Sequence, residues 1–144
     1  VSDWPDEWAA LEMEVLLLTN IERGQGANCG GDDYPPVPPL TMQTQLRCSS
    51  RLHSQDMVDR EFFDHTNPDG ENPFDRMEDA GYQGFIMGEN IALGSPTAAD
   101  VIDGWMNSPG HCTNIMDADY QELGVGYAPS ATLGPFWTQN FGTR

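Results

Sequence analysis

The pentapeptide Gly88-Glu89-Asn90-Ile91-Ala92 lies near the middle of the chain, between two turns that each carry a histidine. The first turn is Asp64-His65-Thr66 and the second is Ser108-Pro109-Gly110-His111. A carboxylate between two imidazoles is chemically suggestive. A single Glu in a glycine-flanked turn is also a common structural hydrogen-bond acceptor. Function therefore depends on whether the fold brings His65, Glu89 and His111 together.

Length and charge limit what the protein can be. Its 144 residues, 38 % of them hydrophobic, predict one domain over 1–144 with a core from about residue 8 to 142. Asp and Glu number 23 against 6 Lys and Arg, a net charge of −17. Such an acidic chain lacks the basic footprint that nucleic acid requires and is repelled by anionic lipid surfaces. A solvated acidic surface is the simplest interpretation of this charge.

The hydropathy pattern predicts no membrane span, because no run of about 18 apolar residues is present. The apolar run Val15-Leu16-Leu17-Leu18 is much too short. The chain begins Val1-Ser2-Asp3-Trp4, without a Met or a basic-then-apolar leader. A mature secreted product and a trimmed expression product would both begin in this way.

Three cysteines permit one disulfide and one free thiol. Cys48 falls within a predicted helix, where a buried thiol behaves as a small apolar residue. Cys29 and Cys112 lie in a glycine-rich loop and beside a turn, so we favour a Cys29–Cys112 bridge, which requires an oxidising compartment. Three reduced thiols in a cytosolic protein are the alternative. No C-x-x-C spacing indicates a cysteine-rich zinc site.

Hydrophobic spacing and turn signals predict helices first and strands later. Residues 8–23 are expected to form an amphipathic helix that buries Trp8, Leu11, Val15, Leu18 and either Ile21 or Glu22. A second helix, with Thr41 as N-cap, is expected to run to Arg60. Further helices are expected over 73–80, over 95–107 with Thr97 as cap, and as one turn over 111–116. The segment between them, 24–39, is rich in Gly and Pro and is expected to be a loop.

Three β-forming segments complete the pattern. Residues 82–92 are expected to be a strand or extended loop, and 123–128 and 136–141 an antiparallel hairpin. Helices before strands, with a hairpin at the end, indicate an α+β fold. His53 lies in the middle of the second helix, and the residue four positions on is Met57 rather than a second ligand. A core histidine with one hydrogen bond is therefore favoured over a metal ligand, although His53 stays a secondary candidate.

The order of motifs resembles one known family. The resemblance covers residues 15–142 and rests on six short pieces that are specific only in combination: Asn20-Ile21-Glu22-Arg23 with His53-Ser54-Gln55-Asp56-Met57, Phe62-Phe63-Asp64-His65-Thr66, Gly88-Glu89-Asn90-Ile91-Ala92, Trp105-Met106-Asn107-Ser108-Pro109-Gly110-His111, Leu123-Gly124-Val125-Gly126-Tyr127-Ala128 and Trp137-Thr138-Gln139. The chain resembles the CAP superfamily of cysteine-rich secretory proteins, antigen 5 and pathogenesis-related protein 1, in its bacterial SCP-like branch.

The resemblance implies a secreted α–β–α sandwich with a small antiparallel sheet and a central cleft lined by two His and two Glu. His65 and His111 match the two histidines, and Glu89 matches the Glu of the Gly-Glu-Asn motif. The second Glu falls near Asn107 or Ser108 in this chain, so one carboxylate of the four residues is missing.

Two imidazoles and one carboxylate suit a divalent cation with an open coordination position. Zinc or a related late metal fits these residues better than calcium, which needs six or more oxygens. The expected ligands are His65, His111 and Glu89, with no organic cofactor. Because a carboxylate is missing, a structural hydrogen-bond cluster is the alternative.

Three functions follow from this set of residues. The first is a secreted binding module whose cleft holds a divalent cation and takes a lipid or another small ligand. The second is a metal-dependent, protease-like hydrolase that uses the same residues. The third is a scaffold that acts through its surface loops. A binding role is favoured over an enzyme. Ser108 beside His111 suggests a Ser–His pair, but neighbours on a tight turn rarely meet side chain to side chain.

Overall fold

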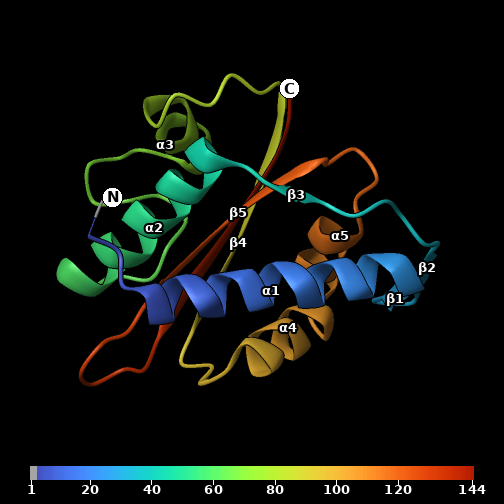
Figure 1. Ribbon diagram of the computed structural model, residues 1–144, viewed down its shortest axis with the longest axis horizontal. Coiled ribbons are helices and arrows are strands. Elements are labelled where there is room, and N and C mark those ends of the chain that lie inside the picture. Colours follow the sequence, from blue (N-terminus) through green and yellow to red (C-terminus); the bar gives the residue numbers. More distant parts are fainter. Residues whose placement is uncertain (1–2) are drawn as a thin grey trace.

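The computed structural model describes residues 3–144, in which five α-helices and six β-strands form three layers (Figure 1). The helices are α1 (Asp6–Gln25), α2 (Thr44–Asp59), α3 (Pro73–Asp79), α4 (Ala98–Met106) and α5 (Pro109–Met116). The strands are β1 (Ala27–Cys29), β2 (Asp32–Tyr34), β3 (Thr41–Met42), β4 (Ile86–Leu93), β5 (Glu122–Ala128) and β6 (Phe136–Thr143). The predicted α+β class and α–β–α sandwich are confirmed. The predicted domain, 1–144, includes Val1 and Ser2, which lie outside the described residues.

The central sheet has four strands in the order β3-β5-β6-β4. The predicted hairpin is confirmed as β5 and β6, which pair antiparallel, and β4 pairs antiparallel with β6. The short β3 pairs parallel with β5. Strand β4 carries the central pentapeptide and forms an edge of the sheet. Because Glu89 pairs with Asn140 and Asn140 with Gly124, all three positions face the same side.

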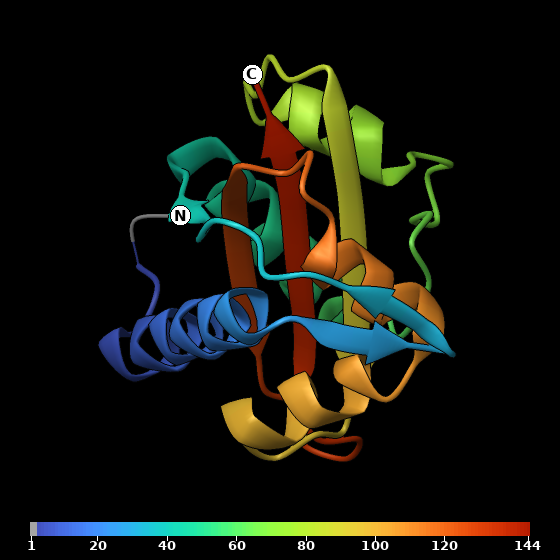
Figure 2. The same ribbon diagram turned by 90° about the vertical axis from the view of Figure 1, so that its right-hand side faces the viewer.

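Helices α2 and α3 cover one face of the sheet, and α1, α4 and α5 cover the other (Figure 2). Two glycines of β5 let α2 lie very close to the sheet. A Cβ at Gly124 would lie 2.0 Å from the carbonyl carbon of Leu46, and one at Gly126 would lie 2.3 Å from that of Ser50. This close approach allows hydrogen bonds between α2 and β5, in which the hydroxyls of Ser50 and Ser54 donate to the carbonyl oxygens of Gly124 and Gly126.

The buried side of α1 is more polar than its sequence predicts. Val15 is buried as expected, but Ile21 is 44 % exposed. The other buried positions are Glu12, Thr19 and Arg23. Arg23 donates hydrogen bonds to the carbonyl oxygens of four residues in distant segments, namely Pro38, Ile115, Asp117 and Tyr120. Tertiary hydrogen bonds therefore stabilise buried groups that hydrophobic spacing alone assigns to solvent.

Two local predictions are wrong. The segment 24–39, expected to be a loop, contains the β1–β2 hairpin, whose turn residues Gly30 and Gly31 have positive φ angles of 64° and 101°. The N-cap of α2 is Gln43, which accepts from the Leu46 amide, whereas Thr41 belongs to β3. The predicted cap Thr97 is confirmed. No helix within residues 3–144 is long and apolar enough to cross a membrane.

Candidate functional site

Glu89 lies at the centre of a polar cluster at the edge of the sheet. Its side chain accepts hydrogen bonds from His65 Nδ1 at 2.8 Å, from Arg76 Nη2 at 3.0 and 2.8 Å, and from Asn140 Nδ2 at 2.8 Å. His53 Nε2 lies 4.0 Å from the carboxylate. These five residues are called the Glu89 cluster below. Both oxygens of Glu89 are occupied by donors, and the residue is only 7 % exposed.

The hydrogen bonds of the cluster determine its charges. Burial alone would raise the pKa of Glu89, but the hydrogen bond from His65 and the positive charge of Arg76 outweigh it and hold this pKa below its ordinary value. The same hydrogen bond to Glu89 raises the pKa of His65. Glu89 is therefore ionised at neutral pH and stabilises a proton on the imidazole of His65.

The bond to Glu89 also sets the tautomer of neutral His65. A carboxylate accepts hydrogen bonds, so Nδ1 of His65 carries a hydrogen and Nε2 keeps a lone pair. Arg76 Nη2 donates to the carbonyl oxygen of His65 at 2.7 Å, which holds the backbone of the loop. Phe63, which precedes this loop, is 48 % exposed and so contributes little apolar packing to it. His65 thus presents Nε2 from a loop that is fixed mainly by polar contacts.

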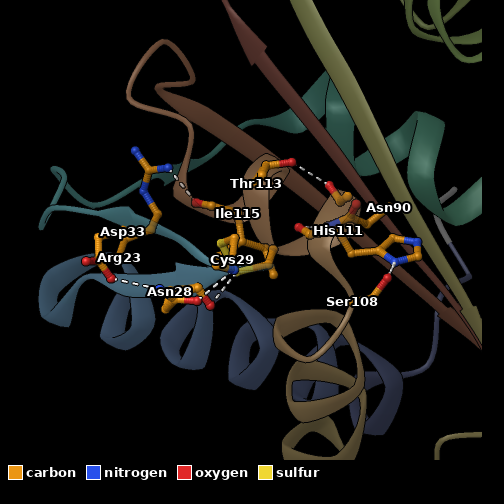
Figure 3. Close-up of a disulfide and its surroundings, with 12 residues drawn as sticks. Arg23, Asn28, Cys29, Asp33, Asn90, Ser108, His111, Thr113 and Ile115 are labelled. Carbon is orange, nitrogen blue, oxygen red and sulfur yellow. Dashed lines mark hydrogen bonds between the residues drawn. A yellow bond between two sulfur atoms is a disulfide. The ribbon is translucent and has the colours of Figure 1, made fainter.

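His111 lies in the first turn of α5, and its Nδ1 is 2.8 Å from Ser108 Oγ (Figure 3). The expectation that these two side chains do not meet is wrong. Ser108 is the N-cap residue in extended conformation, and His111, three positions further on, reaches back to its hydroxyl, side chain to side chain. Burial lowers the pKa of His111, and the charge of His65 lowers it further. His65 and His111 are thus near enough to interact electrostatically.

Helix α5 is fixed to β4 and to the β1–β2 hairpin. The predicted disulfide Cys29–Cys112 is confirmed, and the free cysteine is Cys48 (Figure 3). Asn114 donates to the carbonyl oxygen of Glu89 and to the side-chain oxygen of Asn90. Asn90 in turn donates to the carbonyl oxygen of His111. These contacts hold the second histidine next to the strand that carries Glu89.

The secondary candidates have different environments. His53 is the buried core histidine that was favoured, 1 % exposed, with Nε2 2.9 Å from the carbonyl oxygen of Asp64. Burial lowers its pKa to about 4. Asn107 does not join the Glu89 cluster. It caps α4, is exposed, and donates to Asp103.

Sequence reasoning did not find Arg76 and Asn140, the two residues that neutralise and orient Glu89. The chain has only 6 basic residues, so each arginine is a rare potential partner for a buried acid. That scarcity is a usable signal for Arg76. Asn140 has a weaker signal, since only the strand register places it opposite Glu89.

The three residues of the predicted metal site differ in how many of their polar side-chain atoms are already engaged in hydrogen bonds. His65 and His111 each have one ring nitrogen engaged, at Nδ1, whereas Glu89 has both oxygens engaged. Across residues 3–144, no three or more His, Cys, Asp and Glu side chains are grouped so as to hold a metal ion. Of the three predicted ligands, the two imidazoles fit a cation, and Glu89 fits the role of a hydrogen-bond acceptor that orients His65.

Comparison with known proteins identifies the family of this chain. The profile of the cysteine-rich secretory protein family, CAP, matches residues 18–141. The chain belongs to the CAP family. The Bacillus subtilis protein YkwD is 39 % identical over 137 residues, which cover 95 % of this chain and 49 % of YkwD. The B. subtilis membrane protein YlbC is 34 % identical over 143 residues, which cover 98 % of this chain and 37 % of YlbC. This CAP chain thus spans about half or less of the length of these relatives.

Solved CAP structures show the same architecture. An extracellular protein with an SCP domain from Bacillus anthracis superposes with a TM-score of 0.81 and 28 % identity, covering 98 % of this chain and 44 % of that one. The protein NaASP2, solved with Zn²⁺, has a TM-score of 0.56 and 15 % identity, covering 92 % of this chain and 76 % of that one. At that level of identity the second likeness concerns the fold alone.

Proposed function

We propose that this CAP domain is a secreted, non-catalytic binding module that holds a divalent cation, with zinc favoured, between His65 and His111. The observation that carries the proposal is the 2.8 Å hydrogen bond from His65 Nδ1 to Glu89. Metal-binding histidines commonly donate their other ring N–H to a carboxylate, which fixes the ring and raises its basicity. The bond leaves Nε2 of His65 as the donor atom for a metal.

His111 supplies the second donor atom. Its Nδ1 is engaged by Ser108, so Nε2 is the free nitrogen of this ring as well. Its lowered pKa keeps the imidazole neutral at pH 7, which is the form that binds metal. Two imidazoles suit zinc better than calcium or magnesium. Water or a ligand group would complete the coordination, so the cation would also serve as an attachment point for a small molecule.

Glu89 favours a binding role over hydrolysis. A general base must accept a proton from water and therefore needs an accessible oxygen. The Glu89 carboxylate is buried, ion-paired with Arg76 and held below its ordinary pKa. It orients His65, and it is a poor base for the hydrolase alternative.

A secreted location is supported by two independent facts. The Cys29–Cys112 bridge belongs to an oxidising compartment. The B. anthracis relative with the same fold is described as extracellular. We therefore infer that the chain works outside the cytoplasm.

Zinc titration of matched variants tests the proposal. Wild type, His65→Ala, His111→Ala and His53→Gln would be compared by calorimetry and by competition with a zinc-binding dye. Each alanine variant is expected to bind zinc at least about tenfold more weakly, because it removes one of only two protein ligands. His53→Gln changes the third histidine of the chain and is expected to bind as wild type does. Absence of zinc binding by wild type, or binding by both alanine variants that equals that of wild type, would contradict the proposal.

A lipid ligand is a second candidate, favoured by one surface. Met13, Leu17 and Ile21 are spaced four residues apart on α1 and are 46, 60 and 44 % exposed. An apolar stripe of this kind is a common feature of ligand and membrane contacts. Leu17→Glu is expected to abolish binding of a fluorescent fatty acid without changing zinc affinity. Unchanged fatty-acid binding in that variant would exclude this surface.

A further inference from the structure

The two histidines of the proposed cation site come from opposite faces of the central sheet. His65 lies in the loop that follows α2, which covers one face, and His111 lies in α5, which covers the other (Figure 2). Groups on opposite faces of a sheet come together only at an edge, because paired strands fill the space between the faces elsewhere. Strand β4, which carries Glu89 and Asn90, is such an edge.

Glu89 and Asn90 are neighbours on β4, so their side chains point to opposite faces of the sheet. Glu89 is paired with Asn140 and lies on the face that α2 and α3 cover. Asn90 is paired with Gln139, whose side chain donates to Thr19 of α1 on the other face. Each of the two residues therefore faces the layer from which one of the histidines comes.

The side chain of Asn90 is fully buried, and each of its polar atoms is hydrogen-bonded. Nδ2 donates to the carbonyl oxygen of His111 at 3.2 Å and to Oε1 of Gln139 at 3.1 Å (Figure 3). Oδ1 accepts from Nδ2 of Asn114 at 2.9 Å. An aspartate at this position would lack the two donors, and an aliphatic side chain would lack the acceptor as well. The surroundings therefore require an amide here.

Asn114 fixes the same part of α5 to β4 at a second point. It lies about one helical turn after His111, and its Nδ2 also donates to the carbonyl oxygen of Glu89 at 3.3 Å. Glu89 thus contacts both histidine-bearing segments, since its side chain accepts from His65 and its backbone accepts from α5. A shift of α5 along β4 would leave buried amide groups without partners, which is unfavourable. These bonds therefore fix α5 relative to Glu89.

Given the proposed cation site, on which this inference rests, we propose that Asn90 is the positioning residue for His111, as Glu89 is for His65. Glu89 holds the ring of His65 from one face of β4, and Asn90 holds the backbone of His111 from the other. Two consecutive residues of one edge strand thereby set the separation of the two imidazoles. Metal–ligand distances vary by only about 0.2 Å, so a small displacement of α5 is enough to weaken a cation site made of two imidazoles.

Zinc titration of three variants measures this effect in the intact protein with the disulfide formed. Asn90→Ala is expected to weaken zinc binding at least about tenfold, as is typical when a group that holds a metal ligand is removed. Asn114→Ala is expected to weaken it about fivefold, as for one hydrogen bond, and this half-buried position provides the test if Asn90→Ala does not fold. The control Trp8→Ala removes a ring that packs against Tyr127, about 16 Å along α1 from Thr19, and is expected to lower stability without changing zinc affinity.

Backbone ¹⁵N relaxation of the zinc-free protein provides a second readout that depends on position alone. Asn90→Ala and Asn114→Ala are expected to increase the mobility of residues 109–112 and to leave residues 64–66 as in wild type. Glu89→Gln is expected to show the reverse pattern, because it weakens the contact to His65 and keeps the Asn90 amide. A merely structural role would loosen both segments together, so the reciprocal pattern is specific to positioning.

Two outcomes would overturn the role of Asn90. The first is a zinc affinity of Asn90→Ala and Asn114→Ala that equals that of Trp8→Ala. The second is unchanged mobility of residues 109–112 in both asparagine variants, or equal loosening of residues 64–66. Absence of zinc binding by wild type would instead end the cation proposal. The relaxation pattern of the zinc-free protein would then still decide whether Asn90 holds His111, so the two failures are distinguishable.

Discussion

Replacement of His53 by Gln is expected to remove a specific acid sensitivity from the folded protein. His53 is 1 % exposed, and burial lowers its pKa to about 4. Arg76 also lowers this pKa, while Glu89, the hydrogen bond to Asp64 and the charge of Asp56 raise it. An unfolded chain binds a proton at histidine near pH 6.5, well before the folded protein does. Between these two pH values, protonation therefore favours unfolding.

The size of the effect follows from the pKa difference. The folded-state pKa is below the unfolded value, so the free energy of unfolding falls as the pH decreases from about 6.5 to about 4. A gap of about 2.5 pH units corresponds to about 3 kcal/mol, at 1.36 kcal/mol for each unit. His65 acts in another window, because its raised pKa stabilises the folded state below pH 6.5 and loses this contribution as the pH rises through the folded value.

Urea unfolding at pH 7.5, 6.5, 5.5 and 4.5 measures the difference. Wild type is expected to lose about 2.5 kcal/mol more than His53→Gln over this range, because Gln keeps a side-chain N–H for the Asp64 carbonyl and does not titrate. Proton NMR of the His53 ring provides an independent pKa. An equal loss of stability with falling pH in the two proteins, or a His53 ring that titrates near pH 6.5 in the folded state, would contradict this prediction.

Three other predictions concern stability. Glu89→Gln is expected to cost about 3–5 kcal/mol in urea unfolding, because it leaves a buried guanidinium without its charged partner; a loss below about 1 kcal/mol would contradict this role. Gly124→Ala is expected to lower the free energy of unfolding by more than about 3 kcal/mol, because its Cβ would lie 2.0 Å from the backbone of α2. The control Gly104→Ala lies in open space on α4 and is expected to raise the free energy of unfolding by about 0.5–1 kcal/mol. Thermal melts would show the two alanines shifting the midpoint in opposite directions, and shifts of the same sign would exclude the packing argument. Loss of the Cys29–Cys112 bridge, which spans a sequence separation of 83, is expected to cost about 4–5 kcal/mol, and a melt unchanged by reductant would contradict this.

Local signals in the sequence predicted much of the fold because their causes are local. Pro73 at the start of a helix, Thr97 as a cap and the hairpin of β5 and β6 depend on residues close in the chain. The β1–β2 hairpin was missed because the prolines after it dominated the composition of the segment. The N-cap of α2 was misplaced because β3 pairs with β5, a contact between distant residues that takes Thr41 out of the helix.

The candidate site was predicted only in part, for a related reason. Motif order identified His65, Glu89 and His111, since each lies in a recognisable short segment. The partners of Glu89 come from α3 and β6, whose sequences carry no motif that points to β4. Hydrophobic spacing also failed for α1, where Arg23 is buried because four distant carbonyls accept its hydrogen bonds.

The pentapeptide that contains Glu89 illustrates the division between sequence and structure. The residue order alone shows that a carboxylate lies between two histidine-bearing turns, that two cysteines are available to fix the second turn, and that the chain resembles the CAP family. The role of the carboxylate becomes visible only in the folded protein. Arg76 from α3 and Asn140 from the neighbouring strand β6 donate to both of its oxygens, which makes Glu89 the acceptor that orients His65. A side chain's chemistry depends on the donors and charges around it, and those are set by segments that meet only when the chain folds.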